Sequence, residues 1–171
     1  GVLLVKPLPY LLSSKRLKYF LNLEPLELEI VAGAVPDEDI VAICDLSTEE
    51  QPAKVFHERF REMKPHIGGF TGYRTTAAQV KELAHTVKTL DPSVLVVVGG
   101  IHATIAPADY AVDDIDIIVR GEGGTVFKEI IKRFKAGLPL SFGQVSLSPT
   151  DPDFAGKAGE LPPEFPDIKD I

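Results

Sequence analysis

The amino-acid sequence predicts an α/β domain built on a doubly wound, five-stranded parallel sheet. Short apolar runs alternate with amphipathic stretches along the chain, as they do in consecutive βαβ units. The runs are β-branched or apolar at nearly every position, which is typical of parallel strands buried on both faces. They lie at residues 2–5, 40–44, 67–71, 94–98 and 115–119. We therefore expect a flavodoxin-like sheet with helices on both of its faces.

Four further stretches predict the helices that cover this sheet. They span residues 26–34, 52–64, 76–90 and 125–135. Apolar side chains recur with helical spacing in the stretch 76–90, and Thr76 and Gln79 have the spacing of a capping box at its start. Gly137 is placed to end the last helix.

The composition is that of one globular domain. The 171 residues fall within the usual range of about 100 to 200 for a domain, and a 44% apolar content is enough for one packed core. The formal net charge is -7, and like charges do not gather in long runs. A nucleic-acid partner is therefore not expected.

The sequence also argues against membrane spans and disulfides. Its apolar runs are far shorter than the roughly 18 residues that a membrane-spanning helix needs, and the amino terminus lacks a signal-peptide pattern. We therefore expect a cytoplasmic protein without a transmembrane segment. Cys44 is the only cysteine, so this chain cannot by itself form an internal disulfide or an all-cysteine metal or iron–sulfur site.

The chain divides into a domain at residues 1–137 and a Pro-rich tail at residues 138–171. The tail lacks a sustained hydrophobic period, and we interpret it as a linker toward a C-terminal domain outside this sequence. Within the domain, residues 7–24 exceed the roughly 2 to 6 residues of a usual strand-to-helix connection. This segment starts at the carboxyl end of the first strand, so it is either a lid over a ligand or a structural insertion.

Glycines gather where the third, fourth and fifth predicted strands end. Gly72 follows the third strand, Gly99 and Gly100 follow the fourth, and Gly121, Gly123 and Gly124 follow the fifth. Open α/β sheets bind ligands outside the carboxyl ends of their strands, and glycine lets the backbone approach a ligand closely. Any one of these glycines could equally serve a tight turn, but their gathering on one edge predicts a ligand site there.

Few side chains near this edge suggest chemistry. His102 follows the glycine pair after the fourth strand and is a candidate for ligand contact. Arg120 and Glu122 lie at the end of the fifth strand, where they either contact a ligand or form a structural ion pair. The other histidines are predicted to lie at the surface, and no pattern indicates a metal site or a catalytic triad.

The sequence lacks the motifs of the nucleotide-binding sites that are common in this fold class. The sequence has neither a G-x-G-x-x-G fingerprint after the first strand nor a P-loop. The first strand continues into Lys6-Pro7-Leu8-Pro9-Tyr10, which also lacks the hydroxyl-rich phosphate loop of a flavodoxin. A flavin protein is therefore disfavoured.

The residues at these strand ends resemble the N-terminal cobalamin-binding domain of cobalamin-dependent radical SAM proteins, and the resemblance covers most of the chain. It is carried by residues 3–7, 69–73, 97–104 and 119–123. In that family a downstream barrel holds an iron–sulfur cluster and S-adenosylmethionine. The resemblance implies that both groups belong to a domain outside this sequence, joined through the Pro-rich tail.

The resemblance further implies a cobalamin site at the strand ends. Thr71 stands where such domains place a hydroxyl residue, and Gly99 and Gly100 match the pair that lets the nucleotide tail pass. The D-x-H-x-x-G loop is missing, which implies base-off binding without a histidine ligand. Gly124 stands where the family often has a second glutamate. The implied cofactor-binding residues are Pro7, Tyr10, Thr71, Gly72, Tyr73, Gly99, Gly100, Ile101, His102, Gly121, Glu122 and Gly123.

The implied function is that of a methyl carrier in a radical SAM methyltransferase that modifies an unactivated carbon. The opening stretch and residues 23–27 resemble the hopanoid C-3 methylase subgroup, which implies a lipid substrate. The domain could not catalyse the reaction alone, because it has no means of making a radical. The alternative is a non-catalytic sensor or interaction module that binds cobalamin or another small molecule.

Overall fold

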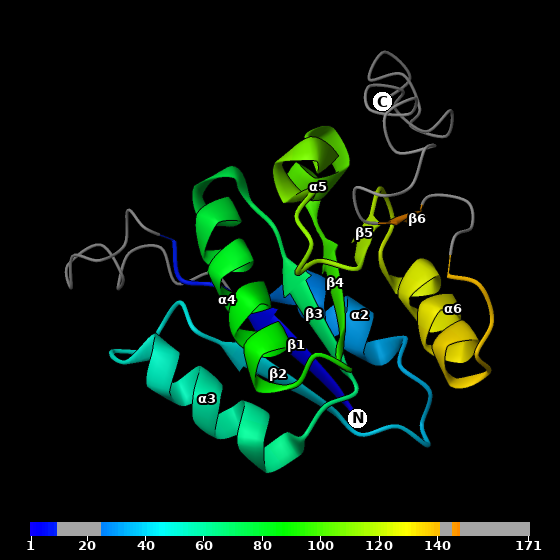
Figure 1. Ribbon diagram of the computed structural model, residues 1–171, viewed down its shortest axis with the longest axis horizontal. Helices are drawn as coiled ribbons and strands as arrows, with labels where there is room; N and C mark the ends of the chain where they lie inside the picture. The colour runs from blue at the N-terminus through cyan, green and yellow to red at the C-terminus, as the bar shows by residue number, and fades with distance from the viewer. Residues whose placement is uncertain (10–24, 141–144, 148–171) are drawn as a thin grey trace.

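A five-stranded parallel sheet forms the centre of the domain, as the sequence predicted (Figure 1). The computed structural model describes residues 1–9, 25–140 and 145–147. Within these residues the strand order is β2-β1-β3-β4-β5-β6, of which the first five have the 2-1-3-4-5 order of flavodoxin-like sheets. The parallel strands are β1 (Val2–Lys6), β2 (Val41–Asp45), β3 (Ile67–Thr71), β4 (Leu95–Gly99) and β5 (Ile117–Val119).

An antiparallel strand extends the sheet beyond β5. This strand, β6 (Val145–Leu147), pairs with β5 so that Ile117 lies opposite Leu147. It falls within residues 138–171, where the sequence indicated only a linker, so part of that tail belongs to the sheet. The role of this tail in leading to another domain stays a prediction.

Helices cover both faces of the sheet (Figure 1). The predicted helices are confirmed to within two residues at each end as α2 (Leu26–Gly33), α3 (Pro52–Met63), α4 (Ala77–Leu90) and α6 (Gly124–Lys135). Helices α3 and α4 lie on one face, and α2 and α6 lie on the other. Three short elements were not predicted, namely η2 (Arg74–Thr76), α5 (Ile101–Ile105) and η3 (Pro107–Tyr110).

The alternating strand side chains build two apolar layers. In β4, Val96 and Val98 pack in the layer under α3 and α4, whereas Val97 packs in the layer under α2 and α6. Leu4 and Val119 join Val97 in the second layer. This burial on both faces explains why the inner strands are apolar at most positions rather than at alternate ones. In the described part of the chain, no helix is long and apolar enough to cross a membrane.

The ends of the helices differ in how well the sequence predicted them. Gly137 follows α6 with a φ of 62°, as expected of a glycine that ends a helix. The capping box of Thr76 and Gln79 is wrong, because α4 has no side-chain capping bond at its start. The Thr76 hydroxyl instead accepts a hydrogen bond from Tyr73 N (3.0 Å) and donates one to Tyr73 O (3.2 Å). It therefore fixes the loop after β3.

Asp116 lies just before β5, at the edge of the sheet where the strands begin, and its hydrogen bonds join this point to β4 and α4. Its Oδ2 accepts hydrogen bonds from Val96 N and from Lys88 Nζ, both at 2.7 Å, and Lys88 Nζ also donates to Val94 O at 2.9 Å. We expect Asp116→Ala to lower the free energy of unfolding by about 1.5 kcal/mol, because it leaves the Val96 amide and the Lys88 ammonium without this acceptor. Urea unfolding followed by circular dichroism measures the change.

The matched control for Asp116 is Asp113→Ala, at an exposed aspartate three residues earlier. This variant should unfold as the wild type does, because surface substitutions away from specific contacts usually change stability by less than about 0.5 kcal/mol. Equal stability of Asp116→Ala and the wild type would show that the network contributes nothing.

Candidate functional site

A cavity of about 370 Å³ lies between the sheet and the helices α2 and α6. Its walls are mainly apolar side chains, and it extends to the carboxyl ends of β3, β4 and β5. Leu28 and Val31 of α2 and Phe127 of α6 form one side, and Leu4 and Val97 of the strands form the other. A mainly apolar cavity with a few polar groups, at the carboxyl edge of a doubly wound sheet, is the usual form of a small-molecule site.

Glycines give this cavity its depth. A Cβ atom at Gly99 would meet only the Val119 Cβ, at 3.8 Å, so the space above Gly99 is open toward the cavity. Gly69 lies in the middle of β3, where a Cβ would come within 2.7 Å of Leu4 Cδ2 and 3.4 Å of the Phe127 ring. Gly69 was not among the predicted site residues. A glycine inside a buried strand often marks a close approach, and this signal could have identified it.

The turn after β4 is held in one shape by its own backbone. Gly100 has a φ of 99°, which favours glycine, and a Cβ there would lie 3.1 Å from the Gly72 backbone and from Thr71 Oγ1. Thr104 Oγ1 donates to Gly100 O (3.0 Å) and accepts from Gly121 N (2.9 Å). The turns after β4 and β5 are therefore joined, and both line the cavity.

Thr71 is the polar residue at the centre of this site. It lines the cavity at the end of β3, and its residue is only 3% exposed. Its hydroxyl oxygen makes no hydrogen bond of normal geometry with the described residues, and the Tyr73 side chain is its polar neighbour. A buried hydroxyl without a partner costs free energy, so native proteins usually satisfy such groups. Thr71 Oγ1 is therefore available to a polar group of a ligand.

Glu122 places a carboxylate at the start of α6. Its Oε1 accepts a hydrogen bond from Gly124 N (2.6 Å), and its Oε2 accepts one from Thr125 N (3.1 Å). The carboxylate thus caps the positive end of the helix dipole. A ligand phosphate would have to displace it to reach these amides, which is a further reason against a flavin mononucleotide at this helix.

Seven of the predicted cofactor-binding residues line the cavity. They are Thr71, Gly99, Gly100, Ile101, Gly121, Glu122 and Gly123. Pro7 is buried at the end of β1, outside the lining, and Tyr10 lies outside the described residues. The remaining three, Gly72, Tyr73 and His102, are described but do not line the cavity.

Gly72 and His102 serve the scaffold around the cavity. Gly72 N donates to Gly99 O (2.8 Å), and Gly72 O accepts from His102 N (3.1 Å). A Cβ at Gly72 would clash with the Tyr110 hydroxyl. The His102 ring pairs with Asp109, with 2.8 Å between Nε2 and Oδ2, and lies edge-on to Tyr110. Both residues therefore hold the β3 and β4 turns together, and the His102 ring is directed to α5 and η3.

Tyr73 reaches the cavity indirectly, through Glu27. The Tyr73 hydroxyl donates a 2.7 Å hydrogen bond to Glu27 Oε1, and Glu27 lines the cavity from α2. Burial, followed by the hydrogen bond to Glu27, raises the pKa of Tyr73 to about 12. The phenol is therefore a protonated donor at neutral pH. Glu27 was not predicted, because no local pattern relates a residue of α2 to the loop after β3.

Other titratable groups suggest no second centre in the described part of the chain. There, no three His, Cys, Asp or Glu side chains gather as they would around a metal ion. Burial raises the pKa of Cys44 to about 11, so its thiol is protonated at neutral pH and is a poor nucleophile. His66 and His85 are exposed as predicted, whereas His57 is half-buried beside Phe56.

The sheet order and the cavity together define a small-molecule-binding domain of the doubly wound α/β class. The family described as the B12 binding domain matches residues 16–131, which is more than half of the chain. This chain belongs to the B12-binding domain family, and the predicted resemblance to a cobalamin-binding domain is confirmed.

Two relatives share part of this sequence. An uncharacterized methyltransferase of Pyrococcus horikoshii is 31% identical over 127 residues, which cover 72% of this chain and 27% of the relative. An anaerobic magnesium-protoporphyrin IX monomethyl ester cyclase of Cereibacter sphaeroides is 32% identical over 107 residues, which cover 61% of this chain and 17% of the relative. The chain thus spans about a quarter or less of the length of these relatives.

Proposed function

We propose that this domain holds cobalamin in the base-off form, with the nucleotide tail of the cofactor inside the cavity that Gly99 lines. The cavity is the observation that supports this proposal. Its volume of about 370 Å³ is near the lower end of the roughly 300 to 1,000 Å³ of small-molecule sites, so it suits the benzimidazole nucleotide and leaves the corrin ring outside. A tail inside the domain cannot at the same time coordinate the cobalt, which is why the proposal specifies base-off binding.

The residues of the cavity fit the parts of that tail. The apolar walls suit a flat aromatic base, and the open space above Gly99 lets the chain of the tail pass close to the backbone. Thr71 Oγ1 can hydrogen-bond a polar atom of the base or ribose. Residues 6–24, which follow the first strand, contain no histidine, and this supports binding without a histidine ligand to the cobalt.

Exposed apolar side chains of α2 and α5 form a rim at the cavity, and Ile30 and Ile101 are also part of its lining. Ile30 of α2 and Ile101 and Ile105 of α5 are 65%, 62% and 68% exposed. Large apolar side chains that gather at the surface often mark an interaction site. We propose that the corrin ring rests on this rim and is covered on its other side by a further domain of the same protein.

We infer that the further domain is of the radical SAM type, with the iron–sulfur cluster and S-adenosylmethionine bound there. The relatives are several times longer than this chain, and one of them is named a methyltransferase. Cys44 is the only cysteine here, so a cysteine-bound cluster needs residues from outside this sequence. Cobalamin, when bound, supplies a cobalt ion that can carry a methyl group. The residues described here hold and orient that carrier.

The reaction we propose for the whole protein is methyl transfer to an unactivated carbon. A hopanoid lipid is the proposed substrate, and it rests on the resemblance of residues 23–27 and the opening stretch to the hopanoid C-3 methylase subgroup. We place the protein in the cytoplasm.

The first test is a titration of the purified chain with hydroxocobalamin. We expect the visible absorbance of base-off cobalamin to co-elute with the protein in gel filtration. Riboflavin 5′-phosphate, tested in the same way, should separate from the protein because Glu122 occupies the amides at the start of α6. Loss of cobalamin from protein that circular dichroism shows to be folded would contradict the proposed site.

A further inference from the structure

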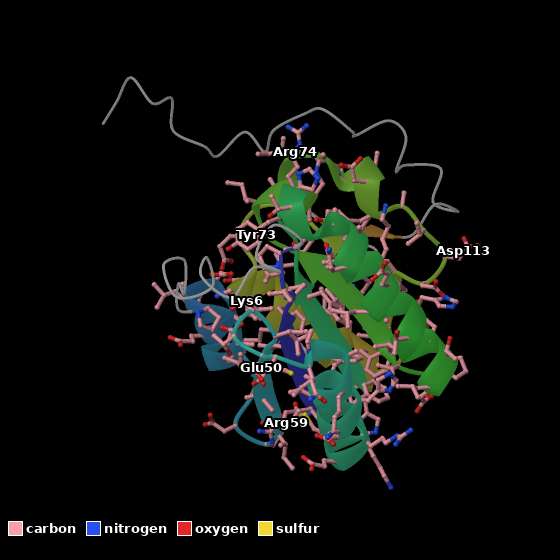
Figure 2. All side chains as sticks on the ribbon, turned by 90° about the vertical axis from the view of Figure 1, so that its left-hand side faces the viewer. Lys6, Glu50, Arg59, Tyr73, Arg74 and Asp113 are labelled. Atoms are coloured by element: carbon pink, nitrogen blue, oxygen red, sulfur yellow. The ribbon has the colours of Figure 1, made fainter. Side chains whose placement is uncertain are left out.

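One hydrogen bond joins the loop after β3 to α2, the helix that forms one wall of the cavity. It runs from the Tyr73 hydroxyl, in the loop after β3, to Glu27 Oε1 in the first turn of α2, over 2.7 Å. The two residues are 46 positions apart in the sequence, so this bond connects separate elements of the fold. In Figure 2 the label of Tyr73 stands between those of Arg74 and of Lys6, the last residue of β1.

The Tyr73 side of this bond is firmly fixed. Its backbone N–H donates to Thr76 Oγ1, and its carbonyl oxygen accepts from Thr76 Oγ1 and, at 3.4 Å, from the Tyr110 hydroxyl. Tyr110 is completely buried in the layer under α3 and α4. The backbone that carries the Tyr73 phenol is therefore held to the core of the domain by hydrogen bonds.

The Glu27 side is much less firmly held. Helix α2 has eight residues, of which only Leu28 is buried, and no side chain caps its N-terminus. A helix this short has little stability of its own and depends on its tertiary contacts. Glu27, Ile30 and Val31 nevertheless line the cavity, so α2 forms one of its walls. Leu28, with the partly buried Val31 and Ala32, attaches α2 to the apolar layer, and the bond to Tyr73 joins its first turn to the loop after β3.

We propose that the Tyr73–Glu27 hydrogen bond is a latch that holds α2 closed over the cavity and so sets how fast the ligand enters and leaves. In this role Tyr73 and Glu27 are positioning residues that act through the placement of α2. The role in ligand exchange rests on the proposed binding of the cobalamin tail in this cavity. The closure of α2 itself does not depend on any ligand.

The first part of the test needs no ligand. Tyr73→Phe removes only the hydroxyl, and hydrogen–deuterium exchange of the amides in residues 28–33 reports the opening of α2. We expect these amides to exchange about five-fold faster in Tyr73→Phe, the effect of losing one hydrogen bond. Glu27→Ala should have the same effect, whereas Glu27→Gln keeps an acceptor oxygen and should restore most of the protection. Unchanged exchange in Tyr73→Phe would overturn the latch.

Glu29→Ala is the matched control for Glu27→Ala. Glu29 lies on the same helix, is exposed, and does not line the cavity. The variant removes the same charge from α2 and should exchange as the wild type does. Acceleration in Glu29→Ala equal to that in Glu27→Ala would mean that the charge of the helix, and not the latch, controls its opening.

The second part measures hydroxocobalamin binding by stopped-flow absorbance. A latch that opens in both the free and the bound states affects entry and exit alike, so we expect association and dissociation in Tyr73→Phe to rise together, each about five-fold, with little change in Kd. Faster dissociation alone would identify Tyr73 as a direct ligand contact and overturn the latch. If the wild type binds no cobalamin but α2 still opens faster in Tyr73→Phe, the closure of α2 stands and the proposed ligand is wrong.

Discussion

Replacing Gly99 with leucine is expected to abolish cobalamin binding while the domain stays folded. A Cβ at this position would meet only the Val119 Cβ, at 3.8 Å, and Gly99 lines the cavity of about 370 Å³, so we expect the rest of the leucine to extend into it. The cavity has room for the leucine but not for the leucine together with the nucleotide tail. We expect the affinity for hydroxocobalamin to fall more than about 100-fold, which corresponds to roughly 2.7 kcal/mol. The same absorbance titration and gel filtration measure this loss.

Gly33→Leu is the control for this variant. Gly33 ends α2, is exposed, and has no atom within 4 Å of the position that its Cβ would take. Leucine there should leave cobalamin binding unchanged. If Gly99→Leu binds cobalamin as tightly as the wild type, the tail does not pass over the end of β4, and the proposed site is wrong.

The sheet could be predicted because four of the five parallel strands, β1, β3, β4 and β5, are buried on both faces. Such a strand needs apolar side chains at nearly every position, and the five mostly apolar runs stand out from the amphipathic helices between them. The strand β6 pairs only along one edge and lies among Pro and Gly residues, so its three residues carry no comparable signal. Helix α5 has five residues, which is too short for a helical period to be recognised.

The glycines of the site were predicted from position alone, but their separate roles were not. Gly99 faces the cavity, whereas Gly72 is a glycine because Tyr110 occupies the space beside it. Tyr110 lies nearly forty residues further along the chain, so the contact depends on the tertiary fold. The same holds for His102, whose ring is paired with Asp109, and for Glu27, which α2 brings to the cavity. A sequence motif shows where the backbone turns and leaves open which side chains the ligand meets.

Thr71→Val is expected to change stability and binding in opposite directions. The variant keeps the shape of the side chain and removes a buried hydroxyl that makes no hydrogen bond of normal geometry with the described residues. We expect the free energy of unfolding to rise by about 1 kcal/mol, because a methyl group there needs no hydrogen bond. The affinity for hydroxocobalamin should fall about 30-fold, or roughly 2 kcal/mol, because a polar atom of the tail loses its partner in a buried site. Urea unfolding and the absorbance titration measure the two effects separately.

Two further variants identify the source of these effects. Thr71→Ser keeps the hydroxyl and should retain most of the affinity. Thr76→Val removes another buried hydroxyl, but one that bonds the Tyr73 backbone, so it should lower stability where Thr71→Val raises it. Undiminished cobalamin binding by Thr71→Val would show that the hydroxyl does not contact the ligand. A gain in stability with a loss of affinity would show that this buried hydroxyl destabilises the ligand-free domain and gains its hydrogen-bond partner only when the ligand binds.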